Sequence, residues 1–319
     1  MTSEVTLDAQ SIHWERQAIE KLLLADLRER RIARRWRMIK SVIWMLLFGA
    51  LIWALSVDAL PGRAAPSARH TAVVGIRGEI SDQGEGSAEN VLPALRNALA
   101  DSGSQALVLL INSPGGSPVQ AGLINDEIHR LRKKYGKPIY AVVEETCASA
   151  AYYIASAADK IYVDKASIVG SIGVLMDGFG FVGTLDKLGV ERRLLTAGRN
   201  KGFLDPFSPQ TEEQRRYAQV MLDQIHDQFI SAVKQGRGNR LKETPETFSG
   251  LFWTGEQSIN LGLADAYGSL DSVARDVVKA EKVVDYTNKV NLAERLAKRF
   301  GAAIGEGAVS ALQAALTMR

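Results

Sequence analysis

Short apolar runs rich in β-branched residues alternate with helical patterns along this chain, and no other feature constrains its fold as strongly. The runs lie at residues 71–76, 106–111, 139–143, 160–163 and 172–176. Helical patterns lie at 88–100, 118–134, 149–158 and 211–234. Strands that are apolar along their whole length are typical of parallel sheets covered on both faces. The alternation therefore predicts an α/β fold with a largely parallel sheet flanked by helices.

The loop after the second strand is a candidate for function, because active sites in such folds lie at the carboxyl ends of the strands. It reads Asn-Ser-Pro-Gly-Gly-Ser at 112–117. Two glycines let backbone N–H groups face an anion at the start of a helix. The same residues could form only a tight turn between a strand and a helix.

The loop after the third strand leads to Ser149, at the expected start of a helix. The helix dipole there favours negative charge on the serine oxygen or on a substrate oxyanion. The ordinary alternative is that Ser149 only caps the helix. Cys147 is a second possible nucleophile, but its apolar neighbours predict an inert, buried thiol.

A nucleophilic serine needs a base, and the histidines are poorly placed for that role. They are His13 in the N-terminal stem, His70 in a linker, and His129 and His226 in charged helices. A lysine can serve when a desolvated pocket keeps its amine neutral. Lys201 stands in a loop among glycines, aromatics and prolines. An exposed loop lysine is the alternative for this residue.

An uncharged run of 17 residues, 41–57, precedes the α/β region. At about 1.5 Å per residue it just reaches across a bilayer core of roughly 30 Å. Seven basic residues between Arg28 and Lys40 flank one side, which favours a cytoplasmic N-terminus and export of the rest. A cleaved signal peptide would need a charged region of 40 residues before the run. We therefore predict a single transmembrane anchor.

The net charge of +3 is confined to the stem before this run. Residues 1–40 contain 9 Lys and Arg against 6 Asp and Glu, whereas the remaining 279 residues contain 30 of each kind. A neutral main domain does not favour nucleic acid as a partner. The single cysteine excludes an intrachain disulfide, and no group of His, Cys or Asp has the spacing of metal ligands.

Six motifs follow one another along the chain. They are residues 112–117, 147–153, 158–161, 169–174, the loop around Lys201, and 253–256 with 262–265. In this order they resemble the signal peptide peptidase A family over roughly residues 71–283. That family comprises membrane-anchored serine peptidases with a Clp/crotonase-like fold, and this chain is similar to its short, single-unit bacterial form.

The resemblance implies a role for five residues. Ser149 matches the nucleophile and Lys201 the general base of a Ser/Lys dyad, while Ser171 matches a hydroxyl that orients the lysine. Gly116 and Ala150 match the N–H donors of the oxyanion hole. The family usually has glycine where this chain has Ala150, so the rate is in doubt if that position requires a positive φ.

The implied activity is that of a membrane-anchored serine endopeptidase that cleaves signal-peptide remnants or other membrane-proximal peptides through an acyl-enzyme. No metal or organic cofactor is implied. One peptidase unit is too short for the tandem form, so a homo-oligomer is expected, in which the lysine meets the serine across a subunit boundary. Two alternatives stay open: a catalytically weak scaffold, and an acyl-CoA enzyme of crotonase type, which the export signal disfavours.

The expected organisation has five parts. They are a cytoplasmic amphipathic basic stem at 1–40, the anchor at 41–57, a linker at 58–70, the peptidase domain at 71–285 and a helical extension at 286–319. The chain would sit in the bacterial inner membrane, in contact with the lipid bilayer. Its peptidase domain would face the periplasmic or extracytoplasmic side.

Overall fold

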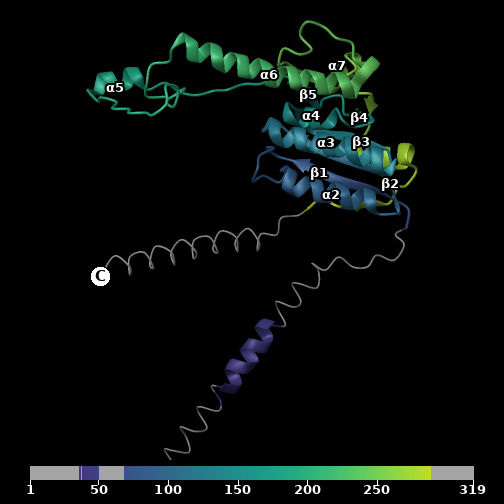
Figure 1. The fold of residues 1–319 in the computed structure, drawn as a ribbon. Helices are drawn as coiled ribbons and strands as arrows, with labels where there is room; N and C mark the ends of the chain where they lie inside the picture. The colour runs from purple at the N-terminus through teal and green to yellow at the C-terminus, as the bar shows by residue number, and fades with distance from the viewer. Residues whose placement is uncertain (1–35, 37, 50–67, 289–319) are drawn as a thin grey trace, which may run out of the picture. The chain divides into compact units, whose positions relative to one another are not determined.

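The computed structural model describes residues 36, 38–49 and 68–288 (Figure 1). The chain forms two units, Met1–Ala65 and Pro66–Arg319. In the first unit, residues 38–49 are helical. Within the ranges that the structure describes, no helix combines the length and apolar character needed to cross a membrane. Most of the stem, residues 50–57 of the expected anchor, most of the linker and the extension from residue 289 onward lie outside the described residues.

The second unit is built on a sheet of eight strands. They are β1 (His70–Arg77), β2 (Ser104–Ser113), β3 (Ile139–Ala148), β4 (Lys160–Val163), β5 (Ile168–Gly170), β6 (Phe252–Thr254), β7 (Ala266–Tyr267) and β8 (Val283–Asp285). The order is β6-β5-β3-β2-β1-β8, and β4 pairs with β3 and β7. Only β5 and β6 run antiparallel among these pairs. The predicted, largely parallel sheet is confirmed.

The central strands are apolar throughout because each face of the sheet is covered. In β2, Leu107 and Leu109 are fully buried on the side of the main core, whereas Val108 belongs to a smaller cluster on the opposite side. That smaller cluster also contains Val73 and Val142 of the neighbouring strands. Alternating side chains therefore enter two different apolar layers, which explains why these strands lack a polar face.

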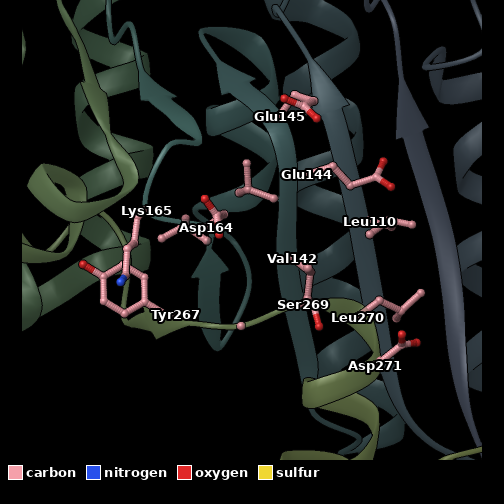
Figure 2. Close-up of a pocket in the computed structure, with 13 residues that line it drawn as sticks. Leu110, Val142, Glu144, Glu145, Asp164, Lys165, Tyr267, Ser269, Leu270 and Asp271 are labelled. Carbon is pink, nitrogen blue, oxygen red and sulfur yellow. The ribbon is translucent and has the colours of Figure 1, made fainter.

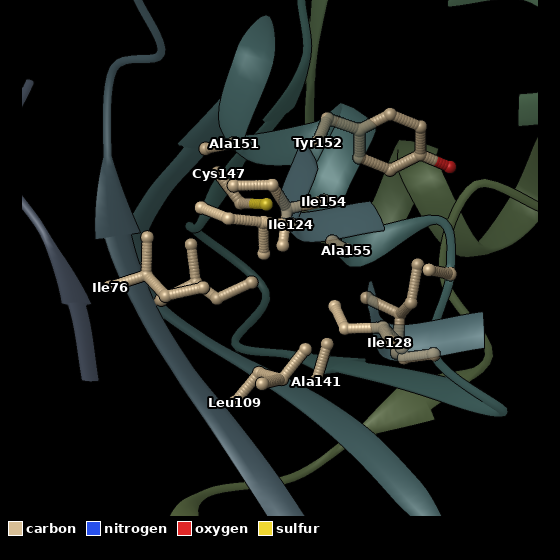
Figure 3. Packing of buried hydrophobic residues seen from close by; sticks show 14 of the residues in the cluster. Ile76, Leu109, Ile124, Ile128, Ala141, Cys147, Ala151, Tyr152, Ile154 and Ala155 are labelled. Atoms are coloured by element: carbon tan, nitrogen blue, oxygen red, sulfur yellow. The ribbon is translucent and has the colours of Figure 1, made fainter. Parts of the chain in front are cut away.

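Three helices cover the main face: α2 (Ala88–Ala100), α3 (Pro118–Tyr135) and α4 (Ala150–Ala155). Local signals set the ends of α3, which starts with a Ser117 cap and Pro118 and stops at Gly136 in the left-handed conformation. Figure 3 shows the resulting core. Its labelled residues come from the strands (Ile76, Leu109, Ala141, Cys147), α3 (Ile124, Ile128) and α4 (Ala151, Tyr152, Ile154, Ala155).

The opposite face is covered more thinly, by α8 (Leu270–Ser272) and the helical segment Val273–Val278 that follows it. Val273 is buried there against the smaller cluster. The two faces thus differ in depth, although both are covered as predicted.

The long helix α6 (Glu212–Arg237) starts at a capping box between Thr211 and Gln214. Its last residue, Arg237, has a fully buried side chain that donates to the carbonyl oxygen of Gly262 and to the carboxylate of Asp265, each at 2.8 Å. The short helices η1 (Gly238–Arg240) and α7 (Gly255–Asn260) follow. The carboxyl end of α6 is therefore fastened to the main domain.

Residues 174–211, which we call the arm, connect β5 to α6 and contain α5 (Val182–Leu188). Figure 1 shows α5 reaching away from the sheet. Most side chains of the arm are exposed, including Leu175, Phe179 and Leu195. An apolar surface of this kind on a loop is unusual for an isolated domain.

Three details differ from the sequence-based expectations. Residues 172–176 are not a strand: β5 ends at Gly170, because Gly170 (φ 103°) and Ser171 (φ 50°) turn the backbone away from the extended conformation. Helix α4 is shorter than residues 149–158. His70 opens β1 instead of lying in a linker, and its ring stacks on Tyr286 and hydrogen-bonds to its hydroxyl at 3.1 Å.

Candidate active site

The loops after β2 and β3 meet at one cavity of about 870 Å³, at the carboxyl ends of these strands. Four of the five residues singled out in the sequence line it: Gly116, Ser149, Ala150 and Ser171. Helix α3 and the middle of α6 supply further walls. The expectation that function would lie at these two loops is consistent with this geometry.

Ser149 occupies the turn between β3 and α4 in a strained backbone conformation, with φ 53° and ψ −125°. Its N–H donates to the carbonyl oxygen of Gly170 at 2.8 Å, and its own carbonyl accepts from Tyr153 at 3.0 Å. Its side chain makes no capping hydrogen bond to α4. Ser149 therefore occupies the N-cap position of α4, but its side chain does not cap the helix. A serine held at such a φ is the kind of strain that clusters at active sites.

The two glycines after β2 are there for different steric reasons. At Gly115 (φ 107°), an added Cβ would lie 2.7 Å from the Cβ of Ser149. At Gly116 (φ 144°), it would collide with the carbonyl oxygen of Ile80. Residues on either side of Gly116 hydrogen-bond to Ile80, at 2.8 and 2.7 Å, but within the described part of the chain the Gly116 amide has no acceptor. That N–H is available to a bound anion.

Ala150 is the first residue of α4, so its N–H has no carbonyl partner within the helix. Neither Ala150 nor Ala151 has a positive φ. The cost of a Cβ that a positive φ would bring therefore does not arise at either position. The positive φ belongs to Ser149 itself.

Ser171 enters the cavity from the end of β5. Its N–H donates to the carbonyl oxygen of Leu251 at 2.8 Å, which links this turn to the segment before β6. Next to it, the carbonyl oxygen of Ile172 accepts a hydrogen bond from Nε2 of His226 at 3.1 Å. The partly buried His226 ring therefore ties α6 to the segment that follows β5.

Lys201 lies apart from the other four residues. It is in the arm, its side chain is exposed, and it is not among the residues that line the cavity. Its backbone N–H donates to Gly198 at 3.0 Å within the same loop. A single chain therefore brings together the serine and both amide donors, but not the lysine.

Cys147 and Asp126 are the other two residues of chemical interest near Ser149. Cys147 is fully buried, and burial raises the pKa of its thiol, so it is inert as predicted. Asp126 is the one charged residue among those that line the cavity. Across residues 36, 38–49 and 68–288, no group of three or more His, Cys, Asp or Glu side chains could hold a metal ion.

Among the other cavity residues, Tyr153 on α4 belongs to the 147–153 motif, whereas Gly122 on α3 and Ile225 and Phe229 on α6 were not expected at the site. The Tyr153 and Phe229 rings contact each other with centroids 5.1 Å apart. No sequence signal marks Ile225 or Phe229, because apolar positions on a helix look the same whether they face a core or a cavity.

A second cavity of about 590 Å³ lies beside β3, β4 and β7 and contains none of the expected site residues (Figure 2). Two of its charged residues have partners nearby. Glu144 forms an ion pair with Arg77 at 3.0 Å, and Nζ of Lys165 lies 5.9 Å from the centre of the Tyr267 ring. It offers no activated nucleophile.

Comparisons with known proteins place this site in context. Residues 131–284 match Peptidase family S49. The chain is 30% identical over 220 residues to a putative signal peptide peptidase SppA of Enterococcus faecium, covering 66% of this chain and 64% of that protein. It is 32% identical over 219 residues to Protease 4 of Haemophilus influenzae, covering 67% of this chain and 35% of that protein.

A further match is the Na(+)/H(+) antiporter NhaA of Brucella abortus, at 46% identity over 181 residues. This match covers 57% of the present chain but only 25% of that protein. The chain thus spans less than two thirds of the length of each of these three relatives.

Proposed function

Because this chain belongs to the signal peptide peptidase A family, within peptidase family S49, we propose that it is a membrane-anchored serine endopeptidase. Its substrates would be signal-peptide remnants or other membrane-proximal peptides. The observation that carries the proposal is the strained Ser149, which shares a cavity with the amides of Gly116 and Ala150, neither of which has an acceptor among the described residues.

The reaction follows from these groups. A neutral lysine amine accepts the proton of the Ser149 hydroxyl as its Oγ attacks the peptide carbonyl carbon. The Gly116 and Ala150 N–H groups stabilise the oxyanion of the tetrahedral intermediate. The C–N bond then breaks, the leaving amine takes the proton from the lysine, and water hydrolyses the acyl-enzyme by the same route.

We assign the base to Lys201, supplied by a neighbouring copy of the chain. Two observations support this assignment. The lysine is on an exposed arm, outside the cavity of its own chain. The same arm presents uncovered apolar side chains, of which Leu195 is 97% exposed. A second copy packed on the arm would cover that surface and exclude water from the amine. Ser171 would orient the incoming amine.

Membrane anchoring forms part of the proposal and rests on the uncharged run at 41–57 with its basic flank. It predicts a bacterial inner-membrane protein with the peptidase domain on the extracytoplasmic side. The Clp/crotonase-like character of the fold is likewise an inference from the resemblance. The weak-scaffold alternative loses its main argument, because Ala150 and Ala151 fit their backbone without strain.

Co-expression of two inactive variants tests both the dyad and its assembly. In the full-length protein, Ser149→Ala and Lys201→Ala should each lower peptide cleavage by about 1,000-fold or more. Lys187→Ala, which removes another exposed lysine of the arm, should leave cleavage unchanged.

Mixed oligomers of the two inactive variants should regain about a quarter of wild-type activity. Half of their subunits contribute an intact serine, and half of the neighbours contribute an intact lysine. No recovery would exclude a lysine from a neighbouring copy. Full activity in either single variant would refute the dyad.

A further inference from the structure

One face of α3 borders the cavity beside Ser149. Its lining residues are Pro118, Val119, Gly122, Leu123 and Asp126. Val119 is 67% exposed and Leu123 is 49% exposed, so this face carries apolar groups that the chain itself does not cover. Large uncovered aliphatic side chains beside a nucleophile are suited to contact an apolar substrate group.

Gly122 is the exception on this apolar face. It lies inside an 18-residue helix, where glycine costs about 1 kcal/mol relative to alanine. Its φ is not positive, and an added Cβ would meet no atom within 4 Å. Gly115 and Gly116, in contrast, have backbone and steric reasons to be glycine. Neither a positive φ nor a clash at Cβ explains the glycine at position 122. The lack of a side chain there instead leaves open volume in the cavity.

The walls around this opening are held in place. The side chain of Asn125 on α3 donates to the carbonyl oxygen of Tyr153 on α4 at 2.8 Å, and Gln120 accepts from the N–H of Ala88 at 2.7 Å. Across the cavity, Tyr153 packs against Phe229 of α6. Because α3 is tied to its neighbours, a side chain added at position 122 would fill the cavity instead of displacing the helix.

We propose that Gly122 determines the size of the substrate side chain that binds next to Ser149, and that it leaves room for a large apolar residue. This inference rests on the proposed peptidase function and specifies the substrate class for the same site. The side chain concerned belongs to the residue whose carbonyl group Ser149 attacks.

Cleavage of a series of acyl-peptide esters tests the proposal, with Ala, Val, Leu or Phe as the residue that bears the attacked carbonyl. We expect the full-length protein to prefer Leu and Phe. Gly122→Leu should lower kcat/KM for these two by about 10- to 100-fold and leave the Ala ester within about 3-fold, since each misfitted methylene costs about 10-fold or more. Gly122→Ala should give an intermediate shift.

Lys133→Leu is the matched control, because it adds the same side chain to an exposed position of α3 that does not line the cavity. It should leave the order of preference unchanged. An equal loss for all four esters in Gly122→Leu, or no change in their order, would overturn the inference.

Binding to a Ser149→Ala background separates this inference from the proposed function. Uncleaved peptides with the same four residues should bind with a size preference that Gly122→Leu reverses. Size-selective binding without cleavage by the wild-type protein would contradict the peptidase function and retain the inference. Neither cleavage nor selective binding would overturn both.

Discussion

The cavity around Ser149 and the arm that carries Lys201 are built in opposite ways. The cavity forms where two buried parallel strands end, and Gly115 and Gly170 contact or bond Ser149 directly. Apart from the cap at the start of α6, the backbone hydrogen bonds of the arm join residues within the arm, and most of its side chains are exposed. Within the described residues, one chain therefore brings Ser149 and the Gly116 and Ala150 amides to one cavity, whereas the Lys201 side chain is exposed and does not line it.

The largest difference between the cavity and the arm should appear when Gly115 and Gly198 are each replaced by alanine. Both glycines have a positive φ, 107° and 101°, but only at Gly115 would a Cβ meet other atoms. Gly115→Ala should lower activity by about 100-fold or more, because Ser149 must shift. Gly198→Ala should cost only its backbone strain, about 1–2 kcal/mol. Ester hydrolysis and thermal unfolding measure the two effects, and similar activities would contradict the comparison.

The next largest difference should come from two carboxylates, one buried at the base of α6 and one exposed and paired with the arm. Burial opposes ionisation of Asp265, but hydrogen bonding and charge from the fully buried Arg237 keep its pKa below the ordinary value. Asp265→Ala leaves that arginine unpaired and should lower the free energy of unfolding by about 3–5 kcal/mol.

Glu213, in the first turn of α6, lies 3.8 Å from Arg199 of the arm, and their side chains are 79% and 84% exposed. Glu213→Ala should therefore change stability by less than about 1 kcal/mol. Denaturant unfolding of both variants provides the measurement. Equal destabilisation would mean that the arm is packed as firmly as the base of α6.

The smallest change in stability should come from substitutions at residues whose φ is positive. Ser149 (φ 53°) and Leu204 of the arm (φ 55°) are both non-glycine residues with a positive φ. Ser149→Gly should be more stable than Ser149→Ala by about 1 kcal/mol, although both lack the nucleophile. Leu204→Gly should gain a similar amount over Leu204→Ala. Melting temperatures of the four variants measure the gain, and no difference at Ser149 would argue against strain at the nucleophile.

The sequence predicted those elements whose signals are local. Helix α2 spans the predicted residues, and α3 and α6 differ only at their ends, because caps such as Ser117, Gly136 and Thr211 act on adjacent backbone groups. The strand expected at 172–176 does not form, because of a contact between residues that are distant in the sequence. Ser171 is held in its turn by the carbonyl of Leu251, 80 residues later in the chain, and no local pattern reports that bond.

By itself the sequence determined the parallel α/β architecture, because its strands are apolar along their whole length. It also determined the two loops where function would lie, because parallel strands end at the same edge of the sheet. It also identified Gly116, Ser149 and Ala150 as candidates. Only the tertiary structure decided that Ser149 adopts a positive φ without a side-chain cap to α4, that Gly122 lines the cavity, and that Lys201 does not. These features depend on how β2, β3 and α6 pack together, and contacts between distant segments leave no periodic trace in the sequence.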